Sequence, residues 1–136
     1  MGTRARIGIL LDDNSILSSY VHWDGYPSYT GAILAKDYTT KEKVSELIDL
    51  GDLSVLKTDR DWDDNYMAEG PLAYSERGEK EVEPALAKDD FAFVQQTRNC
   101  NGEFAYVFNT VTNRWNCYDL NAGEFVDLYK EQAVAA

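Results

Sequence analysis

The stretch EFAYVFNTVTNRWNCYDL, residues 103–120, contains the strongest strand signal in the chain. Two aromatic-rich runs, Glu103–Phe108 and Arg114–Leu120, lie on either side of a polar segment of five residues. Aromatic residues favour strands, and a short polar segment between two such runs is typical of a hairpin loop. The stretch therefore predicts a C-terminal β-hairpin, to which residues 125–129 would add an edge strand.

A second hairpin is predicted near the N-terminus. The apolar residues of Thr3–Leu11 and the β-branched and aromatic residues of Ile16–Trp23 indicate two strands. The turn cluster Asp12-Asp13-Asn14-Ser15 connects them, and Gly25 and Pro27 end the second strand.

Three helices are predicted between the two hairpins, each from its own signal. The first covers residues 29–36. The second begins at Thr39 and Glu42, which together form a capping box, and ends at a glycine. The third covers residues 85–96, because Pro84 is placed to open a helix.

The order of these elements predicts an α+β fold in a single domain, residues 1–136. We expect a mainly antiparallel sheet built from an N-terminal and a C-terminal hairpin, with two or three short helices packed on it. Short strands at 53–56 and 72–75 would extend this sheet. The chain has 136 residues, of which 44% are hydrophobic, so it is large enough to bury one core.

The charge of the chain limits its partners. It has 13 basic and 24 acidic residues, which gives a formal net charge of -11. This charge argues against direct nucleic-acid binding, since nucleic-acid-binding proteins present a basic surface, and against an anionic membrane. It leaves open a basic protein partner, a cation, or mimicry of nucleic acid.

The sequence favours a cytoplasmic protein without a membrane span. It contains no run of about 18 apolar residues, and its first residues do not resemble a secretion signal. Two cysteines are too few for a disulfide framework. We therefore expect Cys100 and Cys117 to be free thiols, with a bridge between them left open.

The residues indicate no catalytic centre, no cofactor and no metal site. The two glycine-rich phosphate motifs do not occur, and one histidine with two distant cysteines cannot form a zinc site. The run Asp59-x-Asp61-x-Asp63 has the opening spacing of a calcium loop, but its sixth position is Asp64 and its twelfth is Gly70. These departures favour a solvated acidic loop, with an adventitious cation left open.

Aromatic residues gather where the second predicted strand leads into a helix. Trp23, Tyr26 and Tyr29 lie within seven residues of one another. Loops on a rigid scaffold concentrate binding residues, and aromatic side chains stack on nucleobases. We therefore predict a pocket at this junction. His22, the only histidine, precedes it and is either a structural residue at a strand end or a general base.

Several segments resemble a known family. The first is Tyr20-Val21-His22-Trp23-Asp24-Gly25-Tyr26-Pro27, and a later one is Ala73-Tyr74-x-x-Arg77-Gly78-Glu79. Together with residues 47–54 and the aromatic hairpin at 106–115, they resemble a family of small uncharacterised proteins of tailed bacteriophages and their bacterial hosts. The resemblance spans most of the chain but not the acidic loop 59–64.

This resemblance implies a phage accessory protein that counters host defence in the bacterial cytoplasm. It also selects a set of polar and aromatic residues for a ligand site: His22, Trp23, Asp24, Tyr26, Arg77 and Glu79. With Tyr29 from the aromatic cluster, these residues would suit a small polar ligand with an aromatic part, such as a nucleotide. The alternative is that residues 24–27 form a structural turn and that Arg77 pairs with Asp24.

Three functions are compatible with these observations. The first is a non-catalytic protein that binds a small nucleotide-like ligand or a host defence factor. The second is an acidic nucleic-acid mimic that inhibits a host nucleic-acid-binding protein. The third is a small hydrolase that uses His22 with Asp24 or Glu79. A homo-oligomer, joined through the aromatic hairpin or the strand at 125–129, also stays open.

Overall fold

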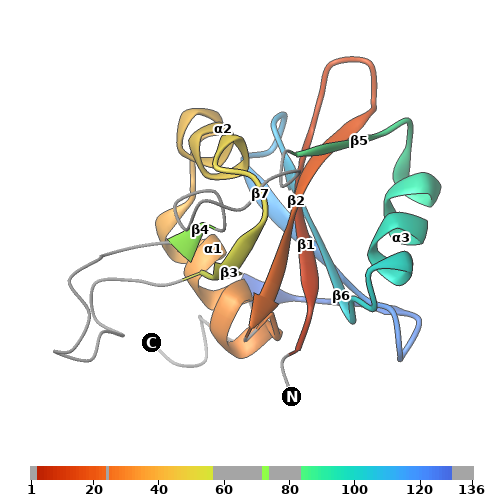
Figure 1. Cartoon of the computed structure of the whole chain (residues 1–136). Helices are drawn as coiled ribbons and strands as arrows, with labels where there is room; N and C mark the ends of the chain where they lie inside the picture. The colour runs from red at the N-terminus through yellow and green to blue at the C-terminus, as the bar shows by residue number, and fades with distance from the viewer. Residues whose placement is uncertain (1–2, 24, 57–71, 74–83, 130–136) are drawn as a thin grey trace, which may run out of the picture.

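The computed structural model describes residues 3–23, 25–56, 72–73 and 84–129 (Figure 1). Within these residues, eight strands form one sheet in the order β4-β3-β2-β1-β6-β7-β8, with β5 paired to β2. The strands are β1 (Ala5–Leu10), β2 (Ile16–Trp23), β3 (Leu53–Val55), β4 (Leu72–Ala73), β5 (Ala85–Ala87), β6 (Phe104–Asn109), β7 (Arg114–Asp119) and β8 (Glu124–Val126).

Two helical segments follow β2, and two more helices are described. A π-helical turn, η1 (Pro27–Gly31), leads directly into α1 (Ala32–Asp37). The helix α2 (Lys41–Asp49) precedes β3, and α3 (Asp90–Asn99) lies between β5 and β6. The fold is α+β, and the expected fold class is confirmed.

The sheet is mainly antiparallel, because five of its seven strand pairings are antiparallel. The two predicted hairpins are β1–β2 and β6–β7. Their first strands lie side by side and parallel, with Ala5 opposite Phe104 and Ile9 opposite Phe108. This parallel contact joins the N-terminal and C-terminal hairpins into one sheet.

Side chains on each strand alternate between the two faces of the sheet. Ile7 and Ile9 of β1 belong to a core of 17 buried residues that α1 and α2 cover, and Tyr106, Phe108 and Trp115 join it from β6 and β7. We call this side the closed face.

On the other side of the sheet, α3 is the only one of the described helices that packs on the strands (Figure 1). Its buried cluster has four members: Ile16, Ala87, Phe93 and Ala105. Gly8 lets α3 approach closely, since a Cβ atom there would lie 3.2 Å from the Phe93 ring and 2.5 Å from Ile16 Cγ2. We call this side the α3 face.

Two helix predictions need correction. The helix predicted at 85–96 is wrong at its start, because Ala85–Ala87 pairs with β2 as a strand. The helix begins only at Asp90, where the Asp89 carboxylate caps it by accepting from Ala92 N–H at 2.9 Å. The predicted capping residue of α2 is also wrong by one position.

Thr40, not Thr39, is the residue that caps α2. Its backbone is extended, and its hydroxyl accepts a hydrogen bond from Lys43 N–H at 3.3 Å. Glu42 therefore falls in the first turn but not at the third position that a capping box requires. The predicted edge strand at 125–129 is shorter than expected, since β8 ends at Val126.

Candidate functional site

The predicted site residues lie at the end of β2 and in the segment that follows it. His22 and Trp23 are the last two residues of β2, Tyr26 precedes η1, and Tyr29 lies within η1. The side chain of Trp23 is not among the described ones. The predictions for Asp24, Arg77, Glu79 and the acidic loop at 59–64 lie outside the described residues.

His22 is engaged by its neighbour on the same strand. The Tyr20 hydroxyl and His22 Nδ1 are hydrogen-bonded at 2.7 Å, and the two ring centroids lie 5.9 Å apart. Tyr20 is opposite Arg6 on β1, whereas Val21 belongs to the closed-face core. Alternation therefore places Tyr20 and His22 on the α3 face of the sheet.

Tyr26 and Tyr29 are brought together by the turn of η1. Their ring centroids lie 6.2 Å apart, and Tyr26 is 37% exposed. Tyr29 is half-buried against the core of the closed face. The structure thus places the tyrosine pair and His22 on different sides of the sheet, and the predicted ligand site formed by all of them stays a prediction.

Gly25 has a structural role within the same motif. Its N–H donates to the Thr3 carbonyl at 2.8 Å, and its own carbonyl accepts from the buried Tyr106 hydroxyl at 2.7 Å. A Cβ atom at this position would lie 2.8 Å from Ala5 Cβ, so no larger residue fits without movement. These two hydrogen bonds connect Gly25 to Thr3, just before β1, and to Tyr106 of β6.

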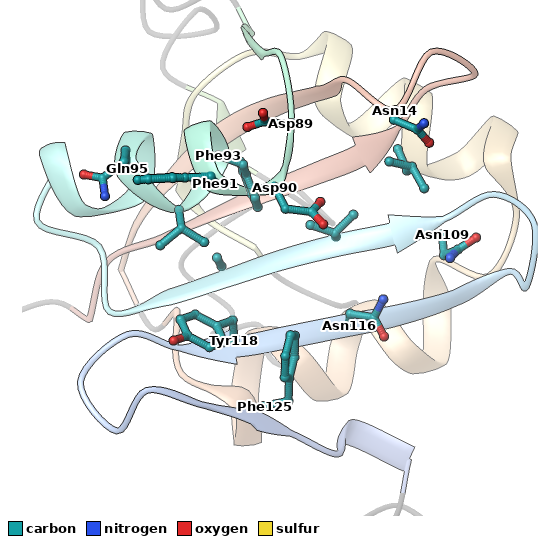
Figure 2. A pocket seen from close by; sticks show the side chains of 14 residues that line it. Asn14, Asp89, Asp90, Phe91, Phe93, Gln95, Asn109, Asn116, Tyr118 and Phe125 are labelled. Atoms are coloured by element: carbon teal, nitrogen blue, oxygen red, sulfur yellow. The ribbon is translucent and has the colours of Figure 1, made fainter.

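A pocket of about 580 Å³ lies elsewhere, on the α3 face, and we call it the α3 groove (Figure 2). It is bounded by α3 on one side and by β6, β7 and β8 on the other. Fourteen residues line it: Leu10, Asn14, Asp89, Asp90, Phe91, Phe93, Val94, Gln95, Ala105, Val107, Asn109, Asn116, Tyr118 and Phe125. None of the predicted site residues is among them.

The α3 groove is open because α3 covers only part of this face. Phe93 points down onto β1 and is 1% exposed, so it holds α3 over the centre of the sheet. Phe91 on the same helix is 61% exposed, and Phe125 on β8 is 74% exposed. The Tyr118 and Phe125 rings meet at 5.2 Å in an edge-to-face arrangement. Aromatic surface is therefore presented on both sides of the groove.

The polar residues of the α3 groove are amides and carboxylates. The side chains of Asp89 and Asn109 already accept hydrogen bonds from nearby backbone N–H groups. Asp89 caps α3, and Asn109 Oδ1 accepts from Val111 N–H at 2.9 Å. The side chains of Asp90 and Asn116 have no hydrogen-bond partner in the described part of the chain.

Positive charge is missing from the lining of the groove. None of its fourteen described lining residues is a lysine, an arginine or a histidine. Arg6 lies on the same face, but it is buried and donates to Ser18 Oγ at 2.8 Å and to the Ser18 carbonyl at 3.1 Å. The groove is thus mainly apolar, and its two charged lining residues, Asp89 and Asp90, are both negative.

Two buried ionisable groups of the closed face, Cys117 and Tyr106, have raised pKa values. Burial raises the pKa of the Cys117 thiol to about 12, and it raises the pKa of Tyr106 well above its ordinary value. Cys100 and Cys117 are both free thiols, as expected. At neutral pH the Cys117 thiol is protonated and therefore a poor nucleophile.

Among the described residues, no group of three or more histidine, cysteine or acidic side chains is arranged to hold a metal ion. No helix of the described segments combines the length and the apolar character needed to cross a membrane.

Comparison of the chain with protein families, with curated proteins and with solved structures finds no match. The sequence did not reveal the α3 groove, although it placed Phe91 in a helix and Phe125 in an edge strand. The signal that the sequence offered was the presence of two phenylalanines, Phe91 and Phe125, in a short helix and a short edge strand.

Proposed function

We propose that this chain is a non-catalytic binding protein and that the α3 groove is its binding site. The observation that carries the proposal is the pair of exposed aromatic side chains, Phe91 and Phe125, on either side of a 580 Å³ pocket. Ligand sites are typically concave, mostly apolar and of roughly 300–1,000 Å³. Covering each aromatic side chain with a partner would contribute about 1.5–3 kcal/mol.

Of the two ligand classes expected from the sequence, the groove favours a segment of a host protein over a nucleotide. A nucleotide brings phosphate groups that need cations or helix N-terminal amides, and this lining offers carboxylates and amides. Asp90 already occupies the first turn of α3 and would repel an anion there.

A nucleotide-like ligand at the Tyr26–Tyr29 pair is the second candidate. It is supported by the two neighbouring rings and by the exposure of Tyr26. A phage accessory role in countering host defence, within a bacterial cytoplasm, belongs to the proposal through the sequence resemblance alone. The described residues add no support to the nucleic-acid mimic or to a hydrolase that uses His22.

The test is a titration of the ¹⁵N-labelled protein followed by amide chemical shifts, with indole as the apolar probe and AMP as the nucleotide probe. We expect indole to shift the amides of Val107, Asn116, Tyr118 and Phe125. The same titration of Phe125→Ser should show weaker shifts, whereas Leu86→Ser should behave as the unchanged protein. Leu86 is a matched control, because it is 60% exposed and does not line the groove.

Two results would overturn this proposal. One is indole binding with no shift at the groove amides. The other is a set of AMP-induced shifts centred on the amides of Tyr26 and Tyr29, with no shifts caused by indole. That result would place the binding site at the end of β2 and in η1.

A further inference from the structure

We infer that the occupant of the α3 groove is an amphipathic helix of a partner protein, with lysine or arginine residues flanking its apolar stripe. This inference rests on the proposed function and specifies the chemistry of the partner. It depends on the width of the uncovered sheet, the distribution of its apolar residues and the charge of its rim.

The uncovered part of the α3 face has the width of one helix. Neighbouring strands of a sheet lie about 4.8 Å apart, so β7, two strands away from β1, lies about 10 Å from it. A helix with its side chains is about 10–12 Å wide. Figure 2 shows α3 above the sheet at one side, where Phe93 contacts β1 at Gly8 and Ala105 of β6 is buried beneath the helix, while β7 and β8 extend beyond it. A second helix would fit beside α3 and complete the layer.

The apolar residues of this region come from both the sheet and α3. Phe91 and Val94 face the groove from α3, and Val107, Tyr118 and Phe125 contribute from three consecutive strands. A helix that lays residues i, i+3, i+4 and i+7 into such a groove contacts both walls at once.

The charge of the groove selects a basic partner. Asp89 and Asp90 line the groove at the start of α3, its lining carries no cationic side chain, and the whole chain has a net charge of -11. Charges of opposite sign accelerate association and discriminate against wrong partners. A second copy of this chain would carry the same net charge, so the charge disfavours self-association through this face.

The probe is a synthetic peptide of 18 residues, a length chosen for this test. Leucine follows the repeating spacing i, i+3, i+4, i+7 of one helix face, and lysine fills the other positions. Two matched peptides replace lysine by glutamate or scramble the leucine positions. Binding of each fluorescently labelled peptide is measured by anisotropy. We expect the leucine–lysine helix to bind, and both matched peptides to bind at least about tenfold more weakly, a difference of about 1.4 kcal/mol.

Variants of the protein locate the binding surface. Phe125→Ser should weaken binding of the leucine–lysine helix about tenfold, while Leu86→Ser leaves it unchanged. Asp90→Asn should weaken binding less, by about threefold, since a single exposed charge contributes roughly 0.2–1 kcal/mol. Glu46→Gln, on the exposed side of α2, should have no effect and is the matched charge control.

The outcomes separate this inference from the proposed function. Equal binding of the ordered and scrambled lysine peptides, or equal effects of Phe125→Ser and Leu86→Ser, would show general charge attraction and overturn the inference. Indole binding in the groove without preferential binding of the basic helix would overturn the inference but not the proposed function. A concentration-dependent dimer in sedimentation that Phe125→Ser abolishes would identify a second copy as the occupant and also overturn it.

Discussion

The two faces of the sheet differ in how completely they are covered. On the closed face, α1 and α2 help to bury 17 residues in one core, including Phe108 and Trp115, whose rings lie 5.3 Å apart. On the α3 face, one helix buries a cluster of four, while Phe91 and Phe125 are exposed. The same strands β6 and β7 contribute to both faces.

This difference separates residues needed for folding from residues available for binding. Large side chains of the closed face lose their water contacts on folding, so their burial stabilises the domain. Phe91 and Phe125 keep most of their water contacts and contribute little to stability. Exposed apolar side chains that gather around a pocket are a common feature of interaction sites.

The largest expected effect compares one phenylalanine from each face. Phe108→Ala removes a fully buried side chain and should lower the free energy of unfolding by about 3–5 kcal/mol. Phe125→Ala should change it by no more than about 0.5 kcal/mol, because the side chain is 74% exposed. Urea unfolding followed by circular dichroism measures both. Similar losses for the two variants would mean that the α3 face is as tightly packed as the closed face.

The next effect concerns the two thiols. The pKa of the Cys117 thiol is about 12, so at pH 8 almost all of it is protonated. Because the thiolate is the reactive form, Cys117 should react with iodoacetamide at least about a hundredfold more slowly than an ordinary thiol. Cys100 is only half-buried at the end of α3, where its thiol donates to the Thr97 carbonyl at 3.2 Å. Peptide mapping of the alkylated protein should therefore find the label on Cys100. Equal labelling of Cys117 in the folded protein would show that water reaches the closed face.

A smaller effect is expected from Tyr106→Phe, which removes the hydroxyl that donates to the Gly25 carbonyl. The loss should cost about 1–3 kcal/mol at neutral pH, since it leaves a buried carbonyl without its partner. The measurement is again urea unfolding. A variant as stable as the original would show that Gly25 does not depend on this bond.

The same variant should alter the alkaline limb of the stability curve. The pKa values of Tyr106 and Cys117 are raised in the folded state, so the unfolded chain loses these protons first as the pH rises. Their contribution is complete below about pH 9, the ordinary range of a thiol, and falls as the pH rises toward 12. Tyr106→Phe should flatten this decline, and an unchanged slope would contradict the burial of the hydroxyl.

The smallest effect is expected at the turn that carries Asn14 to the rim of the groove. The Ser15 hydroxyl and the Ser15 N–H both donate to Asp13 Oδ1, and these bonds hold the pKa of Asp13 below its ordinary value. The resulting contribution to stability is present above the ordinary pKa of 3.8 and lost as the pH falls through the lower folded value. Ser15→Ala should raise the pKa of Asp13, as followed by ¹³C NMR of its carboxyl group. No change in that pKa would contradict the assigned hydrogen bonds.

The sequence predicted the elements whose signals are local. The strand Ile16–Trp23 is observed with its predicted bounds, and β7 begins at Arg114 as expected. Both runs combine β-branched or aromatic residues with clear turn signals at their ends. Residues 85–87 were predicted as helix because Pro84 is placed to open one, but they pair with β2 as a strand instead.

The α3 groove could not be predicted from the sequence, because its walls come from distant segments. Leu10, Val94, Val107 and Phe125 meet only after β1 and β6 pair in parallel. No local pattern specifies that pairing. The motif around His22 was visible in the sequence because its residues are contiguous. In the described part of it, His22 is hydrogen-bonded to Tyr20 at the end of β2, whereas Tyr29 packs on the core of the closed face.

The most direct test of the α3 groove as the binding site is an intermolecular NOE measurement on the complex with the leucine–lysine helix. We predict NOEs from the leucine methyl groups of the peptide to the aromatic rings of Tyr118 and Phe125. NOEs to the rings of Tyr26 and Tyr29 instead, with none to Tyr118 or Phe125, would contradict the assignment and place the site at the end of β2.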